Sequence, residues 1–322
     1  MGNALLIMSD FYGYYSELIK EFNIQGWKIS WMQDNVSLND LERVFSKINK
    51  QYSEKKYDKY FNKTLDNLNN KFDLIIIIFG GNFLEEKHIN ILKQKFKETP
   101  IVYYAWDSVK NFPKIKGLFA CCDKSFTFDK EDALKYNVEF LPLFYIKKIK
   151  SDKKIKYDIS TVMSFYVEKG NRLKTILSSI SDDKTKYLYL RVRSRIYSII
   201  IKFKEYKVYK MLNKYFKFKN LSNEETLSIF EESLAVIDCP LPNQKGLTMR
   251  TFEVLALNRK LITCNSEISN YDFYTPKNIF IVKNENQKIP NSFFEEPFDE
   301  SYSLSENYSI SSFVKKIIMS VK

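Results

Sequence analysis

The residues with the clearest chemical content lie in a polar loop and in the helix expected after it. Gly246, Leu247 and Thr248 precede this helix, and Arg250 and Glu253 fall within it. Anions favour a helix N-terminus, because free backbone amides and the positive end of the helix dipole meet there. A cation and a carboxylate beside such amides indicate a site for a phosphorylated ribose.

Arg250 and Glu253 are also open to a purely structural interpretation. They stand three residues apart, so they could form a surface ion pair worth about 0.2–0.5 kcal/mol. Met249, Phe252 and Ala256 recur at helical spacing and would form the apolar face, which leaves Arg250 and Glu253 off it. The loop before the helix favours the ligand interpretation.

Arg172 is a second candidate ligand for a diphosphate. It follows an apolar strand that is expected to end near Phe165 and a Gly170-Asn171 turn at the start of a helix. An ordinary position on the surface of that helix is the competing interpretation.

Acid–base chemistry must come mainly from Asp, Glu, Lys or Tyr, because the chain has one histidine, His88. A Ser-His-Asp mechanism is therefore disfavoured, and His88 is expected to be inert in a surface helix. Asp107 directly follows an expected strand, where a carboxylate can act as a general base. Asp10, at the end of the first strand, is the competing base. Either carboxylate could instead cap the next helix.

The cysteines and acidic pairs do not suggest a metal site. Asp182-Asp183 stands in a polar turn, outside the strand-loop context of a DxD-like metal motif. Zinc-ligand spacing is missing among the four cysteines, which are expected to be small buried hydrophobes: Cys121, Cys122, Cys239 and Cys264. We expect no metal and no other cofactor.

The elements that must position these residues alternate between strands and helices. In the first part of the chain, strand patterns cover residues 4–8, 27–32, 73–79, 100–107, 121–129 and 138–145, and helical patterns cover 14–22, 38–70, 85–97 and 130–136. After a basic run at 146–156, strand patterns cover 157–165, 187–192, 234–237, 260–263 and 278–282, and helical patterns cover 170–180, 223–232 and 311–321. This alternation predicts an α/β protein with two Rossmann-like domains, residues 1–150 and 151–322, that face a cleft.

The net charge of +12 is concentrated between Lys184 and Lys219, a segment with twelve basic residues, one acidic residue and nine aromatics. A basic amphipathic helix with aromatics favours an anionic membrane surface. The alternative is a solvated lysine face on a helix that packs within its domain. Nucleic acid is disfavoured, because no nucleic-acid-binding motif accompanies the charge. No apolar run approaches a membrane span of roughly 18 residues, and we expect a cytoplasmic protein, with the inner face of the membrane as an open contact.

Four segments carry a resemblance to a known family. They are YYAWDSVKNFP (103–113), SFTFDKEDALKYNVEFLPLFY (125–145), QKGLTMRTFEVLALNRKLITCN (244–265) and YDFY (271–274). With them the chain resembles GT-B glycosyltransferases over nearly its whole length. More narrowly, it is similar to bacterial glycosyltransferases of capsule, exopolysaccharide and lipopolysaccharide clusters, akin to the CgeB-type group.

The resemblance implies a metal-independent transferase with a nucleotide-sugar donor bound to the C-terminal domain. Glu253 would bind the ribose hydroxyls, and Arg250 and the amides of residues 246–248 would bind the diphosphate. The chain departs from the commonest GT-B pattern of two glutamates eight residues apart, because Lys245 stands at the first position. The sugar is therefore left open.

The acceptor implied by the resemblance is a glycan or glycolipid on the N-terminal domain, onto which the helix at 311–321 would pack back. Trp106 and Tyr12 would contact the acceptor, and Asp107 or Asp10 would deprotonate its hydroxyl. A different class stays open, namely a non-catalytic nucleotide- or phosphate-binding module or a membrane-docked scaffold.

Overall fold

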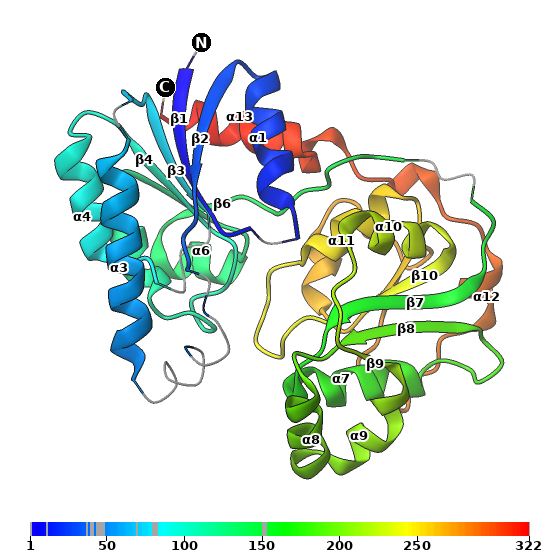
Figure 1. Cartoon of the computed structure of the whole chain (residues 1–322). Coiled ribbons are helices and arrows are strands. Elements are labelled where there is room, and N and C mark those ends of the chain that lie inside the picture. The colour runs from blue at the N-terminus through cyan, green and yellow to red at the C-terminus, as the bar shows by residue number, and fades with distance from the viewer. Residues whose placement is uncertain are drawn as a thin grey trace. The chain divides into compact units, whose positions relative to one another are not determined.

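The computed structural model describes residues 2–10, 12–36, 38, 42, 49–68, 70–78, 83–149 and 153–321. The chain forms two compact units, Met1–Pro142 together with Ile310–Lys322, and Leu143–Ser309 (Figure 1). The division falls at residue 142, before the basic run at 146–156 in which the sequence places it. Part of the expected linker, residues 150–152, lies outside the described residues.

The first unit has six strands and helices between them. The strands are β1 (Gly2–Ile7), β2 (Trp27–Met32), β3 (Leu74–Ile78), β4 (Ile101–Ala105), β5 (Lys124–Thr127) and β6 (Glu139–Phe140). The helices are α1 (Tyr14–Ile24), α3 (Lys50–Asp66), α4 (Glu86–Lys95), α5 (Ile115–Cys121), α6 (Lys130–Tyr136) and α13 (Ile310–Met319). The strands form one parallel sheet in the order β2-β1-β3-β4-β5-β6.

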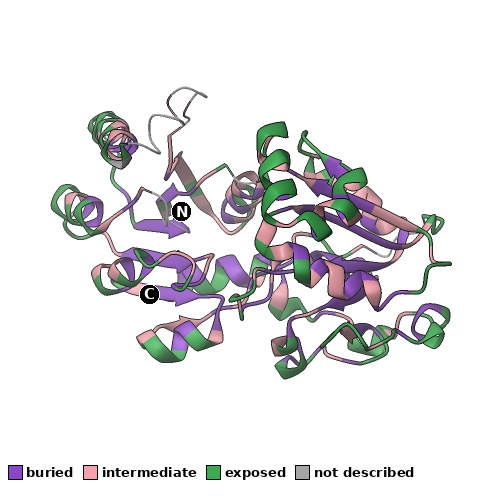
Figure 2. Ribbon diagram, turned by 90° about the horizontal axis from the view of Figure 1, so that it is seen from below, coloured by how far each residue is buried: buried purple, intermediate pink, exposed green. Residues whose placement is uncertain are grey.

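The centre of this sheet is fully apolar because helices cover both of its faces. Every residue of β3 is buried, as the run of four isoleucines predicts. α13 comes from the far end of the chain and packs in the same unit. The rings of Phe313 and Tyr104 of β4 pack edge-on, with their centroids 4.8 Å apart. Figure 2 shows buried strands within each unit and exposed outer faces on the surrounding helices.

The second unit repeats the alternation. Its strands are β7 (Tyr157–Ser164), β8 (Lys186–Arg191), β9 (Phe216–Lys217), β10 (Ser233–Asp238), β11 (Lys260–Thr263) and β12 (Ile279–Ile281). Its helices are α7 (Val167–Ser178), α8 (Arg195–Lys204), α9 (Tyr206–Leu212), α10 (Asn223–Glu231), α11 (Met249–Ala256) and α12 (Asn291–Glu295), with 3-10 turns η1 (Asn213–Tyr215), η2 (Ser266–Asn270), η3 (Glu300–Tyr302) and η4 (Glu306–Tyr308). The sheet is parallel, in the order β12-β11-β10-β7-β8-β9.

The predicted α/β class with two Rossmann-like domains is confirmed, and several local predictions are wrong. Cys121 ends helix α5 instead of starting a strand. The expected strand at 138–145 is reduced to the two residues of β6. Gly170 lies inside α7, which already begins at Val167, so the expected Gly170-Asn171 turn is absent from this described stretch. None of the described helices is long and apolar enough to cross a bilayer.

Candidate functional site

The switch point of the second sheet lies between β7 and β10. β7 has β8 on one side and β10 on the other. Right-handed crossovers then place α7 and α11 on opposite faces of the sheet. The loops that follow β7 and β10 therefore diverge at the carboxyl edge, which is where open α/β sheets bind ligands.

The loop after β10 leads into α11 through the predicted residues. Gly246 and Leu247 are buried, and Thr248 is the N-cap residue of α11. The Thr248 hydroxyl does not cap the helix, because it donates to Oδ2 of Asp238 at 2.8 Å. The Thr251 hydroxyl donates to the same oxygen at 3.0 Å. The start of α11 thus keeps the amides of its first turn free of a side-chain cap from Thr248.

The purely structural interpretation requires Arg250 and Glu253 to form an exposed ion pair on the helix surface. The structure does not show such an exposed pair. Glu253 is buried. The guanidinium of Arg250 lies over the ring of Phe230 in α10, 5.6 Å from the ring centroid. Its Nε is buried and finds no hydrogen-bond partner among the residues that the structure describes. The structure therefore gives Arg250 a packing contact with α10, and its contact with phosphate stays a prediction.

Arg172 joins the two sides of the switch point. From α7, its Nη1 donates to the carbonyl oxygen of Leu241 at 3.2 Å and its Nη2 to that of Pro242 at 2.6 Å. The guanidinium thereby fixes the loop that leads to α11. Arg172 is thus brought to the predicted loop, where it binds main-chain carbonyls.

Two cysteines meet beside Arg172 at the carboxyl edge of the sheet. Cys239 and Cys264 follow β10 and β11 directly, one residue beyond the register pair Asp238 and Thr263. Nη1 of Arg172 lies 3.8 Å from Sγ of Cys264. The Cys239 thiol donates to the Lys169 carbonyl at 3.8 Å. The neighbouring Cys239 thiol lowers the pKa of the Cys264 thiol, and the charge of Arg172 lowers it further despite partial burial. The neighbouring Cys264 thiol raises the pKa of Cys239, and burial adds to this effect.

The candidate bases lie in the first unit, at the carboxyl ends of β4 and β1. Oδ1 of Asp107 accepts from the Ser108 amide at 2.8 Å and from Nδ2 of Asn111 at 2.9 Å, so it stabilises the turn after β4. It does not cap the next helix, because the N-cap residue of α5 is Lys114. Asp10 is exposed. These contacts leave the choice between the two carboxylates a prediction.

The candidate acceptor contacts come from the same edge of the first sheet. Trp106 is half-buried, and its ring lies 5.6 Å from that of Tyr14, the first residue of α1. Tyr12 is exposed and adopts a left-handed backbone conformation with φ of 49°. A non-glycine residue in this region is uncommon, and it turns the chain from β1 into α1.

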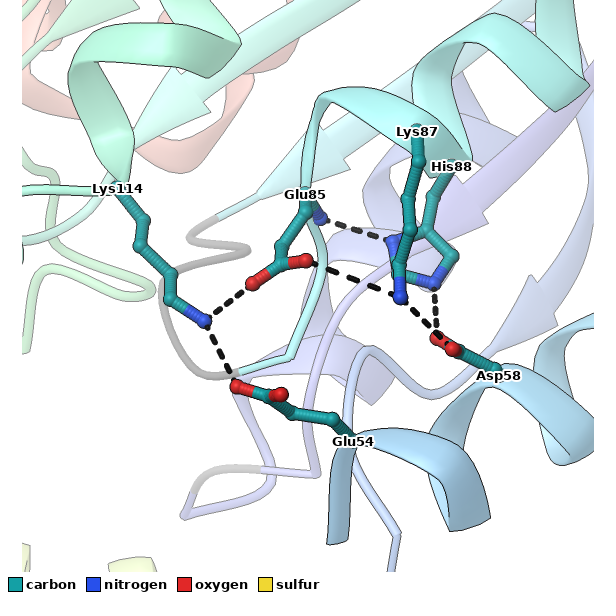
Figure 3. Close-up of polar contacts among 6 residues, drawn as sticks. All are labelled: Glu54, Asp58, Glu85, Lys87, His88 and Lys114. Carbon is teal, nitrogen blue, oxygen red and sulfur yellow. Dashed lines mark hydrogen bonds and ion pairs between the residues drawn. The ribbon is translucent and has the colours of Figure 1, made fainter. Parts of the chain in front are cut away.

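His88 lies in helix α4, as expected, but its side chain is buried, which the sequence did not indicate. Its Nδ1 accepts from the Glu85 amide at 2.9 Å, and its Nε2 lies 2.9 Å from Oδ1 of Asp58 (Figure 3). Glu85 in turn accepts from the His88 amide, which closes a capping box at the start of α4. Burial lowers the pKa of His88. The histidine therefore caps a helix in its neutral form.

Sequence reasoning missed two residues that shape the loop after β10. Asp238 is buried and holds both threonine hydroxyls. Asn265 is also buried; its Nδ2 donates to the Lys245 carbonyl at 2.9 Å. Each is a polar side chain at or just after the carboxyl end of an apolar strand. That position in the sequence could have indicated a role in shaping the loop. Among the described residues, no three His, Cys, Asp or Glu side chains gather as a metal site would require.

Comparison with known proteins rests on structure alone. No protein-family model matches the chain. No curated protein matches its sequence. HepE of Anabaena, solved with UDP, is similar at a TM-score of 0.62 and 9% identity, covering 100% of this chain and 99% of that chain. The catalytic domain of starch synthase IV from Arabidopsis thaliana, bound to ADP and acarbose, is similar at a TM-score of 0.62 and 10% identity, covering 99% and 98%.

An epimerase shares the same architecture. UDP-GlcNAc 2-epimerase from Neisseria meningitidis, bound to UDP-GlcNAc, is similar at a TM-score of 0.53 and 8% identity, with 99% of both chains covered. At these identities the likeness establishes the fold and not the reaction. The chain has the GT-B fold of two Rossmann-like domains.

Proposed function

We propose that the chain is a glycosyltransferase that moves a sugar from a nucleoside-diphosphate sugar to a hydroxyl of a bacterial glycan. The fold supports nucleotide-sugar chemistry, because HepE was solved with UDP-glucose and the starch synthase with ADP. From the resemblance of the sequence, the acceptor would be a lipid-linked surface glycan of the capsule or lipopolysaccharide type.

The observation that carries the proposal is the fixed loop between β10 and α11. Asp238 accepts a hydrogen bond from Thr248. Arg172 donates to the carbonyls of Leu241 and Pro242. Asn265 donates to the carbonyl of Lys245. A loop held at several points positions the first amides of α11 before a ligand arrives. Such preorganised donors stabilise the charge that develops on a diphosphate leaving group.

The proposed roles follow from these positions. The amides at the start of α11 would bind the diphosphate, and Arg250 would assist them after leaving the Phe230 ring. Glu253 would accept hydrogen bonds from the ribose hydroxyls. Asp107 or Asp10 would remove the acceptor proton. In this proposal the reaction needs no metal ion.

The test is slow hydrolysis of a panel of UDP- and ADP-sugars, followed by nucleotide release and by analysis of the sugar product. We expect Glu253→Gln and Arg250→Gln to reduce turnover by tenfold or more. The exposed Glu295→Gln and Lys283→Gln serve as matched controls in the same unit and should keep wild-type turnover. Conversion of the donor to its epimer, without release of nucleotide, would contradict the transferase assignment.

A non-catalytic nucleotide-binding module is the second candidate. It is favoured by the packing of Arg250 on Phe230 and by the turn-capping hydrogen bonds of Asp107. Tight binding of a nucleoside diphosphate without hydrolysis, epimerisation or transfer to any glycan would support this module.

A further inference from the structure

The basic segment of the second unit, residues 184–219, contains two short helices between β8 and β9, and one of these helices exposes an apolar face. The helical conformation is interrupted at Glu205, which is both the C-cap residue of α8 and the N-cap residue of α9. α8 and α9 pack side by side beyond the β8–β9 edge of the sheet (Figure 1). The basic amphipathic helix expected from the sequence is therefore divided among α8, α9, η1 and β9.

We define the apolar stripe as four exposed side chains of α8, spaced at i, i+3, i+4 and i+7: Ile196, Ile199, Ile200 and Phe203. Ile196 is 72% exposed and Phe203 is 82% exposed. This spacing puts the four on one side of the helix. The opposite side carries Ile201, which is fully buried against the core. The stripe is therefore additional to the face that anchors α8.

The break in the helix explains why the apolar stripe remains uncovered. α9 packs against α7 through the buried side chain of Val208. A Cβ atom added to Gly170 of α7 would lie 2.6 Å from Cγ1 of Val208. The absence of a side chain at Gly170 thus lets α9 approach closely. α9 supplies the packed face of the segment, and α8 turns the apolar stripe to solvent.

Positive charge borders the apolar stripe on α8 and continues along the residues that follow this helix. Nine basic residues lie between Arg193 and Lys219, and all nine are exposed. On α8, Arg195 and Lys202 lie along one border of the stripe, and Lys204 lies along the other. In the part of the chain that the structure describes, none of the nine makes an ion pair within 4.0 Å. The charge is available to an anionic partner.

We infer that the apolar stripe and the nine basic residues form a docking surface for an anionic lipid bilayer. The stripe inserts at the boundary of headgroups and acyl chains, as amphipathic interfacial helices do. The basic side chains bind the negative headgroups, each contributing to the partition. A nucleic acid would use the charge and leave four exposed apolar side chains without a function. The inference does not depend on the proposed transferase reaction.

The test is co-sedimentation of the full chain with vesicles, without any sugar donor. The probe is phosphatidylcholine vesicles with about 30% phosphatidylglycerol, compared with pure phosphatidylcholine. We expect binding to the anionic vesicles and release by about 0.5 M NaCl. The double variant Ile199→Gln/Phe203→Gln should lower the partition coefficient roughly tenfold. The triple variant Lys207→Gln/Lys210→Gln/Lys214→Gln should lower it about fivefold per charge.

The matched control is Ile24→Gln/Leu134→Gln, which removes two exposed apolar side chains from the first unit, 77% and 87% exposed. It should bind vesicles as the wild type does. The inference is overturned by equal binding to neutral vesicles, or by stripe variants that bind normally. Wild-type dimers that the stripe variants convert to monomers, without lipid, would also overturn it. So would nucleic-acid binding that exceeds vesicle binding and is insensitive to Phe203→Gln.

Discussion

Oδ2 of Asp238 accepts hydrogen bonds from the hydroxyls of Thr248 and Thr251, and the Thr248 bond measures 2.8 Å. Asp238 and Thr251 are both buried. An Asp238→Ala substitution leaves the Thr251 hydroxyl without this acceptor, and an unsatisfied buried group costs about 1–3 kcal/mol. We expect the free energy of unfolding to fall by about 2 kcal/mol, measured by urea unfolding.

The matched control for this prediction is Asp182→Ala, an exposed aspartate in the same unit. Such surface changes alter stability by less than about 0.5 kcal/mol. The same midpoint of unfolding for Asp238→Ala and Asp182→Ala would contradict a structural role for the Asp238 hydrogen bonds.

Arg172 should control the mobility of the loop after β10. Its two hydrogen bonds to the carbonyls of Leu241 and Pro242 need the planar fork of a guanidinium, which lysine does not have. We expect Arg172→Lys to increase hydrogen exchange at the amides of the non-proline residues between 239 and 248 and to weaken nucleoside-diphosphate binding about tenfold. Lys174→Gln on the same helix is the control. Unchanged exchange in Arg172→Lys would show that the loop is fixed without this side chain.

Local signals in the sequence explain where prediction succeeded. The predicted helix at 130–136 has the bounds of α6. Asp129, a residue type that favours the N-cap position, precedes it in the sequence. In the structure Asp129 accepts from the amides of Glu131 and Asp132. The strands at 27–32 and 260–263 coincide with β2 and β11, since turns bound their apolar runs closely. Caps and apolar runs are local, and a sequence displays them directly.

The features that the sequence did not predict depend on contacts between residues far apart in the chain. No glycine or proline interrupts residues 195–212, so nothing local announces the break at Glu205. After the break, Val208 of α9 packs at Gly170 of α7, 38 positions away in the sequence. The stacking of Arg250 on Phe230 and the pairing of Asp238 with two threonines are tertiary contacts of the same kind. The loop could be located from the sequence, but not the partners that hold it.

His88 should make stability depend on pH below neutrality. Burial lowers the pKa of His88 below its ordinary value of 6.5. Below pH 6.5 the unfolded chain therefore binds a proton that the folded chain excludes, and stability falls until the folded pKa is reached. Protonation of Nδ1 would also break its bond from the Glu85 amide. We expect about 1.4 kcal/mol of loss for each unit by which the pKa is lowered.

The measurement compares urea unfolding of the wild type with that of His88→Asn between pH 8 and pH 5. Asn can still accept from the Glu85 amide but does not titrate. The stability advantage of the wild type should shrink as the pH falls below about 6.5. Asp58 acts in a lower range: partial burial raises its pKa, but hydrogen bonds from Lys87 and His88 outweigh this and lower it from 3.8. Its contribution is full above pH 3.8 and is lost below that value, so a constant wild-type advantage down to pH 5 would contradict the assignment to His88.

Cys264 should be the most reactive of the four free thiols. The neighbouring Cys239 thiol and the nearby charge of Arg172 lower its pKa, whereas burial raises the pKa of Cys122 to about 12 and also raises that of Cys121. The thiolate is the nucleophile, so limiting iodoacetamide near pH 7.5 should label Cys264 first, as mass spectrometry of peptides can show. Arg172→Gln should slow this labelling, because Nη1 of Arg172 lies 3.8 Å from the sulfur. A nucleoside diphosphate should slow it as well if the ligand covers this edge of the sheet. Faster labelling of Cys121 than of Cys264 would show that exposure outweighs the charge of Arg172 in setting thiol reactivity.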